Sequence, residues 1–156
     1  MVREGKKRDT ERLTAIGVQV KETMKLVLFK SVYEKMLRTA RDAAPLEACG
    51  LLAGNGEHVT RCYALTNTDA SSEHFSMKPE EQFAAVKDMR AAGLKMLAIW
   101  HSHPASPARM SAEDMRLAYT PEIVYIIVSL AEPESPRIRA FGVRDDSAHE
   151  IPVIVE

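Results

Sequence analysis

The sequence predicts a mixed α/β (α+β) domain in which helices sandwich a mixed β-sheet. Patterns typical of strands and helices alternate over the first 128 residues, and strands alone complete the chain. The segment 123–128 (Ile-Val-Tyr-Ile-Ile-Val) is almost wholly apolar, which is typical of a central strand buried on both faces. A chain of 156 residues is also long enough for one domain with a substantial core.

The composition is that of an ordinary globular protein, with 46% hydrophobic and 28% charged residues and a formal net charge of −1. This balance gives no reason to expect binding to nucleic acid or to an anionic membrane surface. The two cysteines, Cys49 and Cys62, lie in apolar segments and do not indicate a disulfide framework. No apolar run is long enough to span a membrane, and the charged N-terminal segment does not resemble a secretory signal. We therefore expect a cytoplasmic protein.

The N-terminal part predicts a tail, a strand and a helix. Residues 1–23 are polar with little periodicity, which predicts a flexible tail in front of a folded domain at 24–156. The segment 24–29 alternates partly and predicts a short strand. Apolar residues at helical spacing predict a helix over 31–44, which Pro45 would end. The Ser-x-x-Glu pattern at the start of this helix predicts a capping box.

The next elements are a hairpin and a second helix. The apolar segment 46–53 predicts a buried strand. Glycines and an asparagine at 54–57 predict a turn, so 58–65 would return as an antiparallel partner. Pro79 suits the first turn of a helix, and Gly93 suits its end. Between them, Phe83 and Met89 are among the residues that mark the helical pattern.

The last third of the chain predicts strands and one short helix. The segment 95–100 predicts a strand that leads into a His-Ser-His sequence. Ser111 begins a short helix that ends near Tyr119, because Pro121 blocks its extension. Segments 138–143 and 151–155 predict further strands after the apolar strand at 123–128.

The His-Ser-His sequence indicates a metal site. Side chains alternate along a strand, so the imidazoles of His101 and His103 would point to the same face. Asp114 follows in the first turn of the next predicted helix. Two imidazoles and one carboxylate can hold Zn²⁺ and leave a fourth position to water, as catalytic zinc sites do. This pattern favours a metal-dependent hydrolase.

These residues also allow other interpretations. Ser111 and Asp114 fit equally well as the N-cap of a helix and the acid that complements its dipole. A metallo-β-lactamase-type site would want an acid where Ala105 stands, and an amidohydrolase barrel needs roughly 250 residues. A structural zinc site would normally have a fourth protein ligand. As a general base, Glu47 is a better candidate than Glu113, which is next to Asp114 and points elsewhere around the helix.

Together these motifs resemble the JAMM (MPN+, JAB1/Mov34) metalloprotease family. The resemblance rests on the segment 45–54 (Pro-Leu-Glu-Ala-Cys-Gly-Leu-Leu-Ala-Gly), on His-Ser-His-Pro at 101–104, and on Ser111 and Asp114 at the family's spacing. It covers about residues 25–155. The family fold implied by the resemblance is a cytidine deaminase-like three-layer sandwich, with helices on both sides of a mixed sheet.

The resemblance also implies a role for each site residue. His101, His103 and Asp114 would bind one Zn²⁺ per chain, together with a water. Glu47 would act as general base and then as general acid, and Ser111 would donate a hydrogen bond to the tetrahedral oxyanion.

Members of this family cleave peptide or isopeptide bonds after the C-terminal Gly-Gly of ubiquitin or ubiquitin-like proteins. The short chain and its 106–109 loop look more like bacterial and archaeal members, which process ubiquitin-like sulfur-carrier proteins, for example by releasing cysteine. The alternative is a non-catalytic MPN scaffold that binds partners. The sequence leaves open the carrier protein, the oligomeric state, and whether Cys49 or Arg109 contributes to the site.

Overall fold

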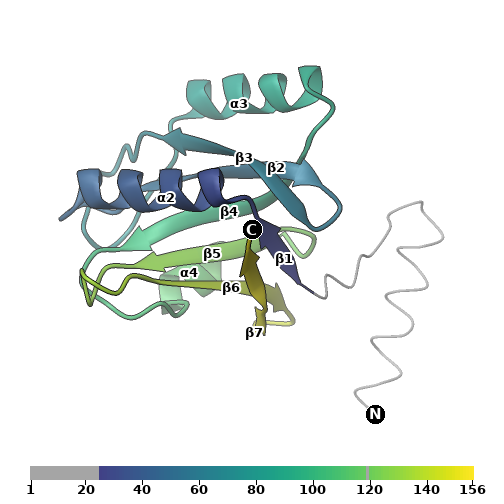
Figure 1. Cartoon of the computed structure of the whole chain (residues 1–156). Coiled ribbons are helices and arrows are strands. Elements are labelled where there is room, and N and C mark those ends of the chain that lie inside the picture. The colour runs from purple at the N-terminus through teal and green to yellow at the C-terminus, as the bar shows by residue number, and fades with distance from the viewer. Residues whose placement is uncertain (1–24, 119) are drawn as a thin grey trace, which may run out of the picture.

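The computed structural model describes residues 25–118 and 120–156, which fold around an eight-stranded mixed sheet (Figure 1). The strands lie in the spatial order β7-β6-β5-β4-β2-β3-β1-β8. In chain order, the elements are β1 (Leu26–Leu28), α2 (Lys30–Ala43), β2 (Cys49–Asn55), β3 (His58–Leu65), α3 (Pro79–Ala91), β4 (Lys95–His103), α4 (Ala112–Leu117), β5 (Val124–Ser129), β6 (Arg137–Arg144), β7 (Ser147–Ile151) and β8 (Val153–Val155). The predicted flexible tail, residues 1–23, lies outside the described residues.

The predicted mixed sheet with helices on both sides is confirmed. β4 pairs parallel with β5, and β1 pairs parallel with β3 and β8, whereas the remaining neighbours are antiparallel. Helix α2 packs against one face through Val32, Met36 and Ala40. Helices α3 and α4 pack against the other face, in separate hydrophobic clusters. All six residues of β5 are buried, as its apolar sequence predicts.

Strand β4 carries the His-Ser-His sequence into the middle of the sheet. Its neighbours are β2 on one side and β5 on the other, and His101 lies between Cys49 and Ile127. Trp100 points into the cluster beneath α2, while Ile99 points toward α3 and α4. Alternation therefore places both histidines on the α3 and α4 side, at the end of the strand.

The first predicted helix begins earlier than expected and lacks its predicted capping box. It starts at Lys30, and its N-cap residue Phe29 makes no side-chain cap hydrogen bond. The Phe29 carbonyl accepts from the amides of Val32 and Tyr33, and the Lys30 amide donates to the Glu156 carbonyl. Because the chain turns directly from β1 into the helix, these backbone groups replace the predicted Ser31 cap.

Two predicted strands have different limits in the structure. The segment predicted at 46–53 enters the sheet only at Cys49, because Glu47 pairs with the loop at Ser71 rather than with a strand. The segment predicted at 151–155 is divided by Pro152, which has no amide hydrogen for a ladder. The strands on either side of this proline, β7 and β8, are the two edge strands of the sheet. Because only one residue separates them in the chain, the sheet must curl to bring its edges together.

Helix α3 presents a different face to the sheet than its aromatic residue suggests. Ala85 and Met89 are buried, whereas 78% of Phe83 is exposed. The predicted limits are close, with Pro79 in the first turn and Gly93 just beyond the end at φ +69°. The small Ala85 allows the helix to lie near Leu51 and Ala53 of β2.

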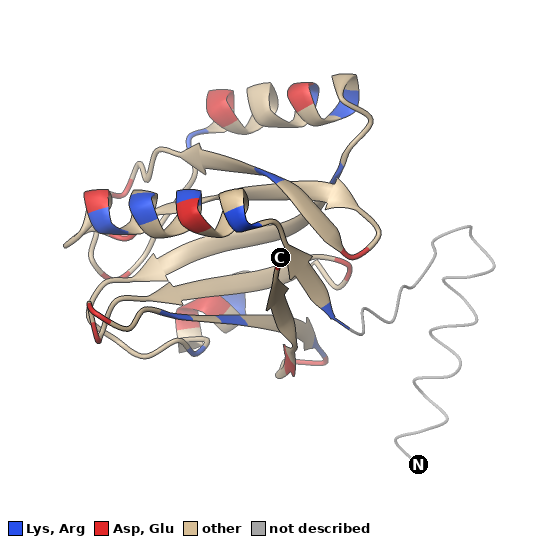
Figure 2. Ribbon diagram, viewed as in Figure 1, with Lys and Arg blue, Asp and Glu red and all other residues tan. Residues whose placement is uncertain are grey.

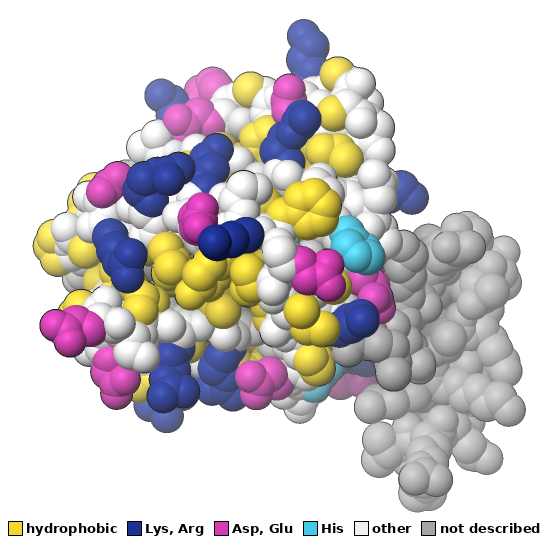
Figure 3. Space-filling model, in the orientation of Figure 1, with side chains coloured by type: hydrophobic (Ala, Val, Ile, Leu, Met, Phe, Trp, Pro, Cys, Tyr) yellow, Lys and Arg dark blue, Asp and Glu magenta, His cyan; other side chains and the backbone are white. Residues whose placement is uncertain are grey.

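Charged residues of both signs are spread over the surface. Helix α2, for example, carries both acidic and basic residues along its length (Figure 2). In the face of Figure 3, hydrophobic side chains gather near the centre and charged side chains surround them. None of the helices in the described residues is long and apolar enough to cross a membrane.

We expect Gly50→Ala to destabilise the fold. A Cβ atom at Gly50 would lie 1.9 Å from the Tyr63 carbonyl oxygen and 2.5 Å from Trp100 Nε1. The backbone of β3 cannot move away from this Cβ atom without breaking its pairing with β2. The free energy of unfolding should therefore fall by about 1–3 kcal/mol or more. Urea unfolding followed by Trp100 fluorescence measures this change. Gly56→Asn is the control, because Gly56 has a positive φ that asparagine tolerates and open space around it.

Candidate metal centre

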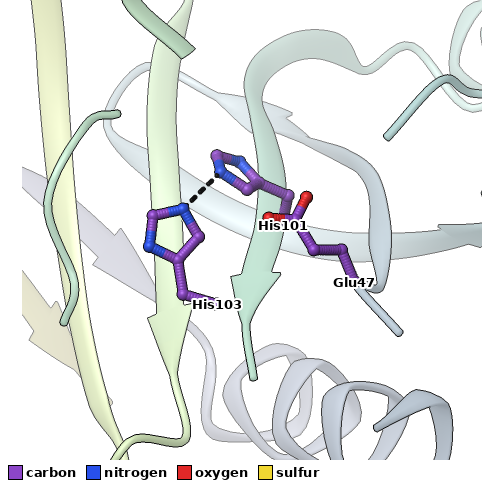
Figure 4. Close-up of side chains that lie close together, drawn as sticks. All are labelled: Glu47, His101 and His103. Atoms are coloured by element: carbon purple, nitrogen blue, oxygen red, sulfur yellow. Dashed lines mark hydrogen bonds between the residues drawn. The ribbon is translucent and has the colours of Figure 1, made fainter. Parts of the chain in front are cut away.

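The five predicted site residues come from three separate parts of the chain. His101 and His103 end β4. Ser111 is the N-cap of α4 and Asp114 lies in its first turn, while Glu47 lies between α2 and β2. Glu47 and both histidines are buried, with 3%, 3% and 5% of their surfaces exposed. Figure 4 shows the two imidazoles turned toward each other, with the Glu47 side chain beside His101.

Two imidazole nitrogens and one carboxylate converge on a common point. His101 Nε2 lies 3.1 Å from His103 Nε2. The two oxygens of Asp114 lie 3.2 Å from these nitrogens, Oδ1 from His101 and Oδ2 from His103. Ligands at about 2.0 Å from a tetrahedral Zn²⁺ are separated by roughly 3.3 Å. The spacing of these donor atoms therefore fits zinc.

The hydrogen bond made by Nδ1 of His103 determines whether its other ring nitrogen, Nε2, carries a proton. His103 Nδ1 donates to the Pro107 carbonyl oxygen at 2.9 Å, since a carbonyl can only accept. In the neutral ring, Nε2 then carries a lone pair, and this lone pair lies 3.2 Å from an Asp114 oxygen. Two acceptors at this distance repel unless a proton or a cation lies between them. The arrangement is therefore suited to a metal ion.

Electrostatics favours the metal-binding form of Asp114 and His101 and opposes that of His103. Burial would raise the pKa of Asp114, but hydrogen bonds from His101 and His103 hold this pKa well below its usual range. Burial lowers the pKa of His101. Burial also opposes charge on His103, but its hydrogen bonds to Asp114 and Pro107 outweigh burial and raise its pKa. A carboxylate and neutral imidazoles are the protonation states that coordinate metals, so a metal bound at His103 would displace a proton from this ring.

Asp114 makes two sets of contacts at once. Its Oδ2 accepts from the Ser111 amide at 2.9 Å, and Ser111 Oγ accepts from the Asp114 amide at 3.0 Å. These two bonds form a capping box at the start of α4. The alternative interpretation of these residues as helix caps is thus present in the structure, and it coexists with the contacts of Asp114 to both histidines. The cap fixes the position of the carboxylate.

Glu47 is held beside the histidines without a partner for one of its oxygens. Its Oε2 is buried and has no hydrogen-bond partner among the described residues. Ligand atoms of Glu47, His101 and His103 all lie within 4.8 Å of one another. Burial raises the pKa of Glu47 to about 7, His103 opposes this shift, and Asp114 adds to it. A carboxyl group in such a site can exchange a proton near neutral pH.

The loop between the histidines and α4 is anchored at three successive carbonyls. His103 holds the Pro107 carbonyl, as described above. Ser129 Oγ donates to the Ser106 carbonyl at 2.6 Å, and Arg139 Nη1 donates to the Ala108 carbonyl at 3.0 Å. Arg139 is itself fixed by a bidentate ion pair with Glu150. These contacts determine where α4, and with it Asp114, begins.

The other candidate residues of the sequence have different contacts or are exposed. Cys49 is fully buried, and its thiol lies 3.6 Å from the Leu65 carbonyl, so it packs as a small apolar residue. Glu113 forms an ion pair with Arg116 on the outer side of α4. Arg109 is exposed. The other three histidines are exposed, as expected: His58, His74 and His149.

Sequence reasoning missed the residues that support the site. The ring of Phe75 stacks on the ring of His101 with centroids 4.7 Å apart. Asn67 holds the backbone of Glu47, and Arg139 holds the 106–108 loop. These residues are far from the motifs in sequence and match no pattern of their own. For Asn67, the only local signal is a cluster of turn-forming residues at 66–69.

Comparisons with known proteins assign the family. Residues 29–142, which is most of the chain, match the family described as prokaryotic homologs of the JAB domain. The chain belongs to this family. This result confirms the resemblance to JAMM/MPN proteins, specifically to those of prokaryotes.

Two curated relatives and one solved structure of another protein are similar to this JAB-domain chain. The chain is 32% identical to a CysO-cysteine peptidase of Mycobacterium tuberculosis over 132 residues, which is 83% of this chain and 90% of the relative. It is 32% identical to a desampylase of Haloferax volcanii over 139 residues, which is 85% and 97% of the two chains. A solution structure of a Desulfitobacterium hafniense protein has 51% identity and a TM-score of 0.77, and covers 84% of this chain and 92% of that chain.

Proposed function

We propose that this protein is a zinc-dependent hydrolase that cleaves peptide or isopeptide bonds after the C-terminal Gly-Gly of a ubiquitin-like or sulfur-carrier protein. The observation that carries the proposal is the convergence of His101, His103 and Asp114 beside the buried, unpaired carboxylate oxygen of Glu47. The names of the relatives support the substrate class, because one is a CysO-cysteine peptidase and another is a desampylase.

His101, His103 and Asp114 are the proposed ligands of one zinc ion per chain. Glu47 is close enough to be considered as a third ligand, since it forms a cluster with both histidines. We favour Asp114, because its two oxygens contact both Nε2 atoms and its pKa is lowered, whereas the pKa of Glu47 is raised. A bound Zn²⁺ would polarise the scissile carbonyl and make a nearby water more acidic.

Glu47 is the proposed general base and acid. With a pKa of about 7, its carboxylate can take a proton from the attacking water and later give that proton to the leaving amine. Its burial keeps bulk water away from this proton, and its Oε2 has no competing hydrogen bond from the described residues. The same group can therefore serve both steps of amide hydrolysis.

Ser111 is the proposed donor to the oxyanion. Its Oγ accepts from the Asp114 amide, so the hydroxyl hydrogen is free to donate to a substrate oxygen. We expect Ser111→Ala to lower kcat by about 10²–10³-fold, as the loss of other oxyanion donors does. Steady-state kinetics at saturating zinc measures this. Ser111→Thr should retain most activity, because threonine keeps both the cap and the hydroxyl; equal losses in both variants would contradict this role.

A carrier ending in Gly-Gly suits a buried site. Glycine lacks a Cβ atom, so a di-glycine tail can enter a narrow passage where bulkier residues would clash. The buried positions of Glu47, His101 and His103 mean that the scissile bond must reach below the protein surface. Selectivity for the two residues before the cleaved bond follows from this requirement.

The test uses Gly-Gly-ending carrier proteins of the same organism, each extended at its C-terminus by a cysteine or a short peptide, or joined to a lysine. The zinc-loaded protein should release the carrier with a free Gly-Gly end, as measured by intact mass. A chelator should stop the reaction, and carriers with Ala-Ala in place of Gly-Gly should be cut poorly. If none of the extended carriers is cut, the non-catalytic scaffold is the better interpretation.

A further inference from the structure

The loop between β3 and α3, residues 66–78, supports the site from outside the motifs. The Glu47 amide donates to the Ser71 carbonyl at 2.8 Å, so the segment that carries Glu47 is paired with this loop. The loop closes on itself through an isolated bridge between Asn67 and Met77. Its return arm carries Phe75, which stacks on His101 at an interplanar angle of 25°. One loop thus touches both Glu47 and a proposed zinc ligand.

The side chain of Asn67 connects the two arms of this loop to Glu47. Its Nδ2 donates to the Glu47 carbonyl and to the His74 carbonyl, each at 3.1 Å. Its Oδ1 accepts from the amides of Asp69 and Ser76, each at 3.1 Å. The amide group therefore uses both of its donor hydrogens and both of its lone pairs. This is the full hydrogen-bonding capacity of an asparagine side chain.

The bonds of Asn67 fix two features of the site at once. The bond to the Glu47 carbonyl holds the backbone from which the catalytic carboxylate extends. The bonds to His74 and Ser76 hold the residues on either side of Phe75, and so hold the ring against His101. Asp69 adds support, because its Oδ2 is bonded to His74 and to Ser76.

We propose that Asn67 is a positioning residue that sets the place of the Glu47 carboxylate relative to His101 by holding Glu47 and the Phe75 arm together. The proposal rests on the function proposed above for Glu47. Only an amide side chain of this length provides two N–H donors and an oxygen that accepts two hydrogen bonds at position 67. An aspartate has the same shape but no donor, so it would place oxygen against the Glu47 and His74 carbonyls.

The decisive variant is Asn67→Asp, studied in the full chain loaded with zinc. We expect kcat to fall by about tenfold or more, because a shift of about 1 Å in a catalytic group can cost 10²-fold. The KM for the carrier substrate and the affinity for zinc should stay within about threefold, since Asn67 bonds to no proposed zinc ligand and is expected to act on the chemical step. Thr68→Val is the matched control: it removes one loop hydrogen bond, from Thr68 Oγ1 to the Ser76 carbonyl, without affecting Glu47.

A second measurement does not depend on activity. Long-range ¹H–¹⁵N spectra of the histidine rings should show shifted His101 signals in Asn67→Asp, because the Phe75 ring would move, and unchanged His101 signals in Thr68→Val. Shifted signals without any cleavage by the unaltered protein would support the positioning and reject the proposed function. The proposal for Asn67 is overturned if Asn67→Asp has an unaltered kcat and His101 spectrum, or if Thr68→Val has the same losses. Should Asn67→Asp fail to fold, Asn67→Ser, which keeps one donor, replaces it under the same criteria.

Discussion

A Glu47→Gln variant is expected to bind zinc as the unaltered protein does and to lose cleavage by about 10²–10⁴-fold. Glutamine has the shape of glutamate but cannot take up and release a proton, so only the proposed acid–base function is removed. The fold should persist, because the substitution replaces a carboxyl group that burial already drives toward its neutral form. Metal analysis of the purified protein and single-turnover cleavage measure the two outcomes separately.

Glu113→Gln is the matched control for this prediction. Glu113 is also an acid near the site, but its carboxylate is partly exposed and faces Arg116. Its substitution should change kcat by less than about threefold, since an exposed ion pair contributes little. Undiminished turnover in Glu47→Gln would remove Glu47 from the mechanism. Loss of zinc in that variant would instead make Glu47 a ligand, in agreement with the cluster of Glu47, His101 and His103.

An Asp114→Asn variant is expected to lose both zinc and activity. The neutral amide is a much weaker ligand than the carboxylate, and it no longer compensates the charge of the ion. We expect the zinc dissociation constant to rise by about 10²-fold or more, which exceeds the effect typical of residues that only orient a ligand. Competition with a chromogenic chelator gives this constant without an activity assay.

This variant also separates ligand binding from helix capping. Asparagine can still accept a hydrogen bond from the Ser111 amide, so the capping box at α4 should largely survive. The melting temperature in the absence of zinc should therefore fall only by the contribution of the contacts between the carboxylate and the two histidines. If the metal-free variant unfolds far more easily than the metal-free parent, the main function of Asp114 is structural. His58→Gln, which alters an exposed histidine, controls for nonspecific zinc binding.

Local patterns predicted the elements where one physical effect dominates. The apolar segment 123–128 is buried along almost its whole length. The hydrophobic effect favours its burial whichever strands become its neighbours. Pro79 and Gly93 mark the ends of α3, because their backbone constraints act within one or two residues. By contrast, the pattern at Ser31 failed, because backbone groups outside the predicted helix satisfied its start.

The sequence alone determined which donor atoms share one strand and one helix turn. Alternation along β4 places His101 and His103 on one face, and the capping pattern places Asp114 at the start of α4. Only the tertiary structure decided that Glu47 lies beside these residues, because the pairing of β2 with β4 joins segments about fifty residues apart. It also decided the support by Asn67, Phe75 and Arg139, whose contacts arise from loop packing and have no periodicity. Periodic patterns report local geometry, whereas a catalytic site is assembled from contacts between distant segments.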